Sequence, residues 1–259
     1  MYRAALPDES VNISTANPLL TAVKLGVSLA LIAAIAFVGL HYLVDIAVSS
    51  ISPEQEAKLE EMFVVEGNAT DTNSSYLRRV TQRMVRCAKL PYPIHIRIME
   101  ESEPNAFALP GGLIYVTRGM LKKLKSENAL AFIIGHELGH FSHRDHLRGL
   151  GYRLILSMLG VLLGSDYGTV TQMTLDIGSA KYSQSAEFAA DSYGLEMLQC
   201  AYGTVTGATT LFEEMDTGNE WRYFMATHPG FKERVRRMKE EILQKHFDTV
   251  QKPIPLKKI

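Results

Sequence analysis

The stretch Ala129–His146, which reads ALAFIIGHELGHFSHRDH, constrains the fold more than any other part of the chain. At its centre, the residues from His136 to His140 form an HExxH pattern. Residues four apart lie one turn apart on the same face of a helix, so both imidazoles can point at one metal ion. Glu137 lies beside them, where its carboxylate can take a proton from water. The pattern predicts a zinc site on a helix.

The residues before this pattern predict where the helix begins. Ser126 provides an N-cap and Glu127 an acidic first turn. Leu130, Ile133 and Ile134 then recur at helical spacing, and no proline interrupts the run. We therefore expect a helix with an apolar face that begins directly after Ser126.

A third protein ligand is needed, because a catalytic zinc ion usually takes three and leaves the fourth position to water. Glu187 is the favoured candidate. It lies in the segment SQSAEFAAD, where Asp191 follows it by about one helical turn. A second helix can thus present Glu187 as a ligand. Asp191 would then hold a ligating imidazole by its other nitrogen.

The alternative ligand is His146, which follows His140 as in the longer pattern HExxHxxGxxH. That pattern has a glycine at position 143, because the chain must turn away from the helix there, and this chain has His143. On a continuous helix, at about 100° per residue, His146 would lie about 120° from the face that carries His140. The geometry therefore favours Glu187.

The segment Leu25–Val44 contains no formal charge and lies between Lys24 and Asp45. Its twenty residues, at about 1.5 Å each, match a hydrocarbon core roughly 30 Å thick. A cleavable signal peptide is the alternative, but the apolar run and the leader before it are both too long. We predict a retained single-pass anchor in the lipid bilayer. It divides the chain into a tail (1–24), the anchor (25–44), a linker (45–53), a catalytic domain (54–247) and a second tail (248–259).

The charges around the anchor predict its orientation. Arg3 and Lys24 precede it, whereas Asp45, Glu54 and Glu56 are the first charged residues after it. The positive-inside rule then places the N-terminus in the cytoplasm and the catalytic domain outside it, in the periplasm or an equivalent compartment.

The composition as a whole carries little further information on partners. The chain has 27 basic and 28 acidic residues among 259, so its net charge gives no reason to expect nucleic acid as a partner. Cys87 and Cys200 have no CxxC neighbour, and we interpret them as buried thiols. A disulfide between them is the alternative, and it would require an oxidising compartment.

Two short strands are predicted at Ile94–Met99 and Leu113–Thr117, because apolar residues alternate there or run continuously. The segment Asn105–Leu109 between them can lie along the edge of a small sheet, with a turn at Pro110–Gly112. An edge strand has unpaired backbone groups to which an extended peptide can bind. Helices are expected at 76–90, 183–200 and 231–246. The first of these has arginines on its solvent-facing side.

His228 lies directly before the last of these helices, in the sequence THPG. This is a position from which a side chain can face a cleft. The expected fold class is α+β, mainly α, behind one transmembrane helix.

Four motifs, in order NAFALPGG, HELGH, AEFAAD and THPGFKER, resemble the HtpX-like and CAAX-prenyl-protease-like family of membrane-associated zinc metalloendopeptidases. The resemblance covers roughly residues 54–246 and implies a zincin-like core. In having one predicted span, the chain looks more like single-anchor members such as BepA and LoiP.

The resemblance implies roles for individual residues. Three of them, His136, His140 and Glu187, would bind one zinc ion, and Glu137 would be the general base. Asp191 would hold a ligand histidine, and His228 would donate to the transition-state oxyanion. Two residues of the edge strand, Asn105 and Ala106, would contact the substrate backbone.

The expected function is hydrolysis of peptide bonds in unfolded or misfolded envelope and membrane proteins, bound in an extended conformation. One alternative is a non-catalytic, chaperone-like or regulatory relative, although a pure binder would need no Glu137. Another is a metzincin-type protease that uses His146 as the third ligand. A third is a zinc hydrolase that acts on a non-peptide bond.

Overall fold

The computed structural model describes residues 17–60, 69–70, 75–162, 182–208, 211 and 221–257. The first sixteen residues of the predicted N-terminal tail and the last two of the C-terminal tail lie outside this part. The chain divides into two compact units, one up to Ile46 and one from Ala47 onward, and each is described by itself.

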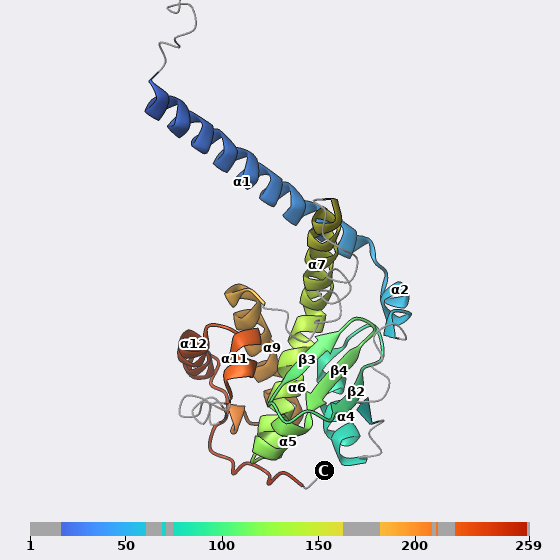
Figure 1. The fold of residues 1–259 in the computed structure, drawn as a ribbon. Helices are drawn as coiled ribbons and strands as arrows, with labels where there is room; N and C mark the ends of the chain where they lie inside the picture. The colour runs from blue at the N-terminus through green and yellow to red at the C-terminus, as the bar shows by residue number, and fades with distance from the viewer. Residues whose placement is uncertain are drawn as a thin grey trace, which may run out of the picture. The chain divides into compact units, whose positions relative to one another are not determined.

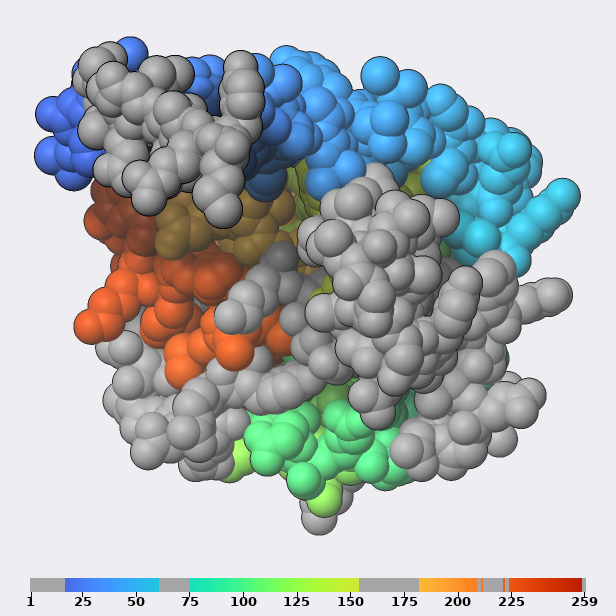
Figure 2. Space-filling model, turned by 45° about the horizontal axis from the view of Figure 1, so that its top comes forward, coloured from blue at the N-terminus to red at the C-terminus, as the bar shows by residue number. Residues whose placement is uncertain are grey.

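The first unit consists of most of helix α1 (Pro18–Ser50). Every side chain of this helix from Pro18 to Gly39 is exposed, and many are large and apolar, such as Leu25 and Ile35. Part of the helix is visible in blue in Figure 2. Among the described residues, α1 is the one helix that is long and apolar enough to cross a membrane. It contains the predicted span and extends beyond it at both ends.

The second unit contains a small four-stranded sheet with the order β1-β2-β4-β3. Strands β2 and β4 are parallel, whereas β1 pairs with β2 and β3 with β4 in antiparallel fashion. The two predicted strands are confirmed, and so is the predicted edge strand, because β3 pairs with β4 alone among the described strands and ends the sheet. The turn at Pro110–Gly112 is also confirmed, with positive φ at both glycines. The strands are β1 (Ala69–Thr70), β2 (His95–Met99), β3 (Ala106–Leu109) and β4 (Leu113–Thr117).

The described helices of this unit account for more than half of its described residues (Figure 1). Those predicted from the sequence are present, with ends that differ by a few residues. The helices are α2 (Pro53–Ala57), α4 (Ser75–Ala88), α5 (Arg118–Lys123), α6 (Glu127–Ser142), α7 (Asp145–Leu162), α9 (Gln184–Tyr202), α11 (Arg222–Thr227) and α12 (Phe231–Gln244).

Helix α6 is the centre of the unit, between the sheet and α9 (Figure 1). All residues from Asn128 to Phe141 are buried, which is the pattern of a helix packed on every side. The predicted N-cap is present, since the Ser126 hydroxyl accepts a hydrogen bond from the Ala129 N–H at 3.1 Å.

Small residues allow α6 and α9 to approach closely. A Cβ atom on Gly139 would lie 2.8 Å from the Cα of Ala190, and one on Gly194 would lie 3.1 Å from the backbone nitrogen of His136. Glycine is therefore required between the two histidines of the HExxH pattern. This close packing brings the first turns of α9 within reach of the imidazoles of α6.

The structure corrects the interpretation of the cysteines. Cys87 of α4 and Cys200 of α9 form a disulfide, and their Cα atoms are 6.1 Å apart. The prediction of two buried thiols is therefore wrong. The alternative, a disulfide between them, is correct, and it forms because α4 and α9 lie side by side.

The described residues of the predicted C-terminal tail pair with the start of α6. The Glu127 N–H donates to the Ile254 carbonyl at 2.8 Å, and the Leu256 N–H donates to the Lys125 carbonyl at 3.3 Å. This segment therefore belongs to the same unit as α6. On the face drawn in Figure 2, residues of the strand region (green) and of the C-terminal helices (orange) reach the surface.

Candidate metal centre

Four buried side chains converge at the middle of the second unit. His136 and His140 come from α6, Glu187 from the first turn of α9, and His228 from the residue that follows α11. Each offers one ligand atom, and these atoms all lie within 4.8 Å of one another. The structure thus brings together the three predicted metal ligands and the predicted oxyanion donor.

The distances between the ligand atoms fit one small ion. The Nε2 atoms of His136 and His140 are 3.2 Å apart. The Glu187 carboxylate oxygens lie 3.5 Å from His136 Nε2 and 3.6 Å from His140 Nε2. Zinc–nitrogen bonds of about 2.0–2.1 Å in a tetrahedron place neighbouring ligands about 3.3 Å apart. The donor set, two imidazoles and a carboxylate, is also one that zinc prefers.

His228 faces the same group with its Nδ1 atom. This atom lies 3.3 Å from His136 Nε2 and 3.1 Å from Glu187 Oε1. Its ring stacks on Phe224, with centroids 4.5 Å apart. In this arrangement His228 can serve as a fourth metal ligand. The sequence had suggested only that His228 donates a hydrogen bond to the transition-state oxyanion.

Each helix histidine is held by a carboxylate at its other nitrogen. Asp191 Oδ1 lies 3.0 Å from His136 Nδ1, and Asp145 Oδ2 lies 3.0 Å from His140 Nδ1. Such contacts favour a proton on Nδ1 and leave Nε2 free to bind a metal. The sequence suggested this arrangement for Asp191 but gave Asp145 no role. The position of Asp145, just after the HExxH helix, could have identified this role from the sequence.

Arg234 is a further residue that sequence reasoning missed. Its side chain is buried, and Nε and Nη2 each donate to an oxygen of Asp191 at 2.7 Å. Nη1 lies 2.6 Å from Glu187 Oε2. Arg234 thus fixes both carboxylates contributed by α9 and offsets their charge. It lies within the THPGFKER motif, which was the available signal.

These contacts determine the protonation of the group. Burial raises the pKa of Glu187, but the charges of His228 and Arg234 outweigh it and hold that pKa well below its usual range. Burial likewise raises the pKa of Asp191, and Arg234 outweighs burial, so the net shift is downward. Both carboxylates are therefore anionic, as a metal site requires.

The pKa values of the two helix histidines shift in opposite directions, because their neighbours differ. Burial lowers the pKa of His136, and its acidic neighbours do not fully compensate. Burial also lowers the pKa of His140, but hydrogen bonds to Asp145 and Glu187 outweigh it and raise this pKa to about 9. Without a cation, His140 therefore binds a proton at neutral pH, and a metal ion would have to displace that proton.

Glu137 differs from the other carboxylates, because neither of its buried oxygens has a hydrogen-bond partner among the described residues. His228 Nε2 lies 3.9 Å from its Oε1. A buried carboxylate without partners is costly. The unpaired Glu137 carboxylate indicates that a bound group, such as a water molecule beside a metal ion, completes the site. The residues present thus fit a zinc ion.

His146, the alternative ligand, does not join this group. Its Nε2 lies 2.6 Å from Glu56 Oε1, and its Nδ1 lies 3.3 Å from the carbonyl of His140. Helix α6 ends at Ser142, and the residue that takes the left-handed conformation is Arg144, with φ of 59°. The chain therefore leaves the helix, but the turn directs His146 toward Glu56 and away from the metal ligands.

The predicted substrate-contacting residues lie beside the group. Asn105 is buried, and its backbone exchanges hydrogen bonds with Thr117 on the neighbouring strand. Ala106 begins β3, and its carbonyl oxygen lies 3.4 Å from His228 Nε2. The start of the edge strand is thus adjacent to the metal centre. Tyr182, which the sequence did not single out, stacks on His140 with centroids 3.8 Å apart.

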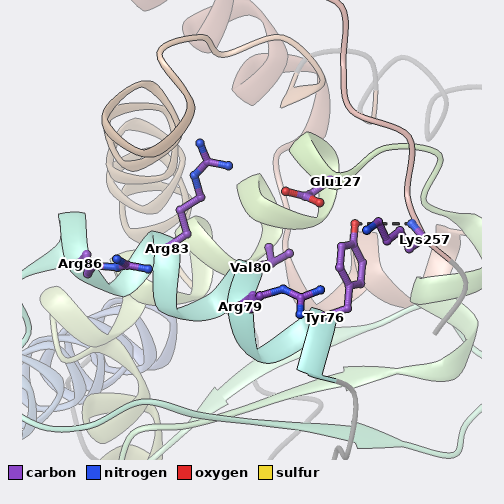
Figure 3. A pocket seen from close by; sticks show the side chains of 7 residues that line it. All are labelled: Tyr76, Arg79, Val80, Arg83, Arg86, Glu127 and Lys257. Carbon is purple, nitrogen blue, oxygen red and sulfur yellow. Dashed lines mark hydrogen bonds between the residues drawn. The ribbon is translucent and has the colours of Figure 1, made fainter.

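The arginine-rich face of α4 lines a separate cavity of about 300 Å³ (Figure 3), which includes none of the four grouped residues. Arg83 Nε donates to the Ala201 carbonyl at 2.8 Å, and its guanidinium lies 4.0 Å from the centre of the Tyr202 ring. The contacts of Arg83 therefore tie α4 to the end of α9. The cavity is lined by Tyr76, Arg79, Val80, Arg83, Arg86, Glu127 and Lys257.

A buried HExxH helix, a second helix that carries a third potential ligand and a small sheet with an edge strand define a zincin-like core. The chain belongs to peptidase family M48, whose profile matches residues 71–242. This confirms the family resemblance of the four motifs.

Three curated relatives illustrate the similarity. The mitochondrial metalloendopeptidase OMA1 of Schizosaccharomyces pombe is 29% identical over 176 residues, which are 64% of this chain and 52% of OMA1. The metalloprotease LoiP of Escherichia coli is 24% identical over 209 residues, 74% of this chain and 82% of LoiP. The protease HtpX homolog 1 of Sulfurisphaera tokodaii is 32% identical over 165 residues, 61% of this chain and 48% of that protein. The chain spans about half the length, or less, of the OMA1 relatives that it matches.

Proposed function

We propose that this protein is a membrane-anchored zinc metalloendopeptidase. The observation that carries the proposal is the convergence of His136, His140 and Glu187 beside Glu137, a buried carboxylate that has no hydrogen-bond partner. Membership of family M48 and similarity to a metalloendopeptidase and a metalloprotease support the same activity.

The three ligands would hold one zinc ion, which when bound supplies a Lewis acid that acidifies water and polarises a carbonyl group. Glu137 would take the proton from the attacking water at its unpaired oxygens and later pass it to the leaving amine. His228 would donate from a ring nitrogen to the carbonyl oxygen as negative charge develops there.

The edge strand suggests how substrate is held. β3 pairs on one side only, and its first residue, Ala106, lies next to His228. An extended peptide that adds to this edge would place its backbone at the metal centre. Such binding selects for unfolded segments with few demands on side chains. We therefore propose unfolded or misfolded envelope and membrane proteins as substrates.

Two observations support the proposed compartment. The charges around α1 favour a cytoplasmic N-terminus, and the Cys87–Cys200 disulfide favours an oxidising environment for the peptidase domain. We propose that residues 54–247 form this domain on the non-cytoplasmic side of the membrane.

The test is cleavage of casein by the purified full-length chain, with bound zinc measured in the same sample. Glu137→Gln should retain zinc and lose nearly all cleavage, because it removes the proton acceptor and leaves the ligands. Glu127→Gln, at the start of the same helix, is the matched control and should cleave normally. Equal cleavage by wild type and Glu137→Gln would refute the assigned base. Binding of casein without cleavage by either would favour a non-catalytic binder.

A further inference from the structure

Glu56 is a completely buried carboxylate outside the metal centre. It belongs to α2, the short helix that follows the membrane helix. Its Oε1 accepts a hydrogen bond from His146 Nε2 at 2.6 Å and its Oε2 one from Arg144 Nη2 at 3.0 Å. The hydroxyl of Tyr92 is a third partner. Burial raises the pKa of Glu56, but these partners outweigh it and keep the pKa below the usual value, so the carboxylate is anionic.

The two residues that Glu56 holds most closely lie where α6 passes into α7: Arg144 is in the turn between the helices, and His146 is in the first turn of α7. Arg144 is in the left-handed conformation, with φ of 59°, which is unfavourable for a residue other than glycine. The same Nη2 atom also donates to the carbonyl of Ile51 at 2.8 Å. The segment after the membrane helix therefore supplies the contacts that compensate for this strained turn.

Asp145 lies between these two residues, and its carboxylate contacts His140 Nδ1 at 3.0 Å. His146 additionally places its Nδ1 3.3 Å from the backbone carbonyl of His140. Glu56 thus binds the residues on both sides of Asp145, and Asp145 orients the candidate metal ligand His140. Displacement of either neighbour would move Asp145 relative to His140.

We propose that Glu56 is a positioning residue for the metal ligand His140, so that the segment directly after the membrane helix forms part of the zinc site. The inference rests on the proposed function, because it assumes that His140 binds zinc. The contacts of Glu56 are with Arg144, His146 and Tyr92, so it acts on His140 through Asp145. The conformation of the segment next to the membrane thereby determines zinc affinity.

The test measures the zinc dissociation constant of the full-length chain in detergent, by competition with a fluorescent chelator. Carboxylates that orient ligand histidines typically change metal affinity by about 10–100-fold when they are mutated. We expect Glu56→Gln to raise the zinc dissociation constant about tenfold and to alter the visible spectrum of the cobalt-substituted protein. Glu54→Gln is the matched control, since Glu54 lies on the same short helix, is exposed and contacts Ser52. It should bind zinc as the wild type does.

A double-mutant cycle tests whether Glu56 affects zinc binding through Asp145. If Glu56 acts through Asp145, the variant Glu56→Gln/Asp145→Asn should bind zinc no more weakly than Asp145→Asn alone. Unchanged zinc affinity in Glu56→Gln, or multiplication of the two single effects, would overturn the proposal. Should Glu56→Gln fail to fold, Arg144→Gln is measured instead, with the same criteria. Failure of the wild type to bind zinc would instead refute the proposed function.

Discussion

At the scale of single residues, the carboxylates of the site divide into two kinds. Glu187 and Asp191 are paired with Arg234 and with histidines, and their pKa values are held low, so they remain anionic. Glu137 is equally buried but has no hydrogen-bond partner. Groups of the first kind hold and orient a metal, whereas the second kind is available to exchange a proton. The arrangement of partners thus separates binding from catalysis.

His228 can be a donor to substrate or a fourth ligand, and a substitution distinguishes these roles. We expect His228→Ala to bind zinc with unchanged stoichiometry and to cleave about a hundredfold more slowly or worse, because a developing oxyanion loses one donor. The measurement is kcat and KM on a quenched peptide, with zinc content as control. Faster cleavage by His228→Ala would show that His228 only occupies the fourth position and would contradict the donor role.

At the scale of elements, the site depends on the close contact between α6 and α9. Gly139→Val should force the helices apart, because even a Cβ atom at this position would lie 2.8 Å from the Cα of Ala190. We expect a loss of stability of about 1–3 kcal/mol, as in other overpacked cores, together with weaker zinc binding. Chemical denaturation and zinc titration measure the two effects.

Gly149→Ala is the matched control for this prediction. Gly149 lies in α7, and a Cβ atom there would meet no atom within 4 Å. This variant should be as stable as the wild type or up to about 1 kcal/mol more stable. Normal zinc affinity in Gly139→Val would show that the helix contact does not position the ligands.

The disulfide joins two elements that are 113 residues apart in the sequence. A disulfide that closes a loop of this length lowers the conformational entropy of the unfolded chain. In the chain-entropy account this stabilises the folded protein by about 4–5 kcal/mol. We expect Cys87→Ser/Cys200→Ser to unfold at markedly lower denaturant concentration. Peptide mapping of wild type without reduction should recover the linked pair. Free thiols in protein extracted directly from membranes would remove one support for the non-cytoplasmic location.

At the scale of the whole molecule, the sequence predicted what depends on local periodicity. The HExxH helix, its N-cap at Ser126 and the pairing of Glu187 with Asp191 on one helix follow from spacings of a few residues. The long apolar run in α1 was equally visible. Membership of the family then followed from four ordered motifs.

The remainder could not be predicted because it depends on contacts between distant segments. Arg234 meets Asp191 across 43 residues, and His146 meets Glu56 across 90. Nothing in the local pattern specifies which acid a buried arginine or histidine will find. In the sequence, Glu56 was only one of several acidic residues after the anchor, and its burial became evident only from the fold.

The central claim is that α6 and α9 together form one zinc site, with Glu187 as the third ligand. The most direct test is the zinc stoichiometry of the full-length chain at saturating zinc, measured by mass spectrometry of the metal. We predict one ion per chain for the wild type and for His146→Ala, the latter with lower affinity because the contact with Glu56 is lost. Glu187→Ala should bind almost none. One ion in Glu187→Ala and none in His146→Ala would contradict the account.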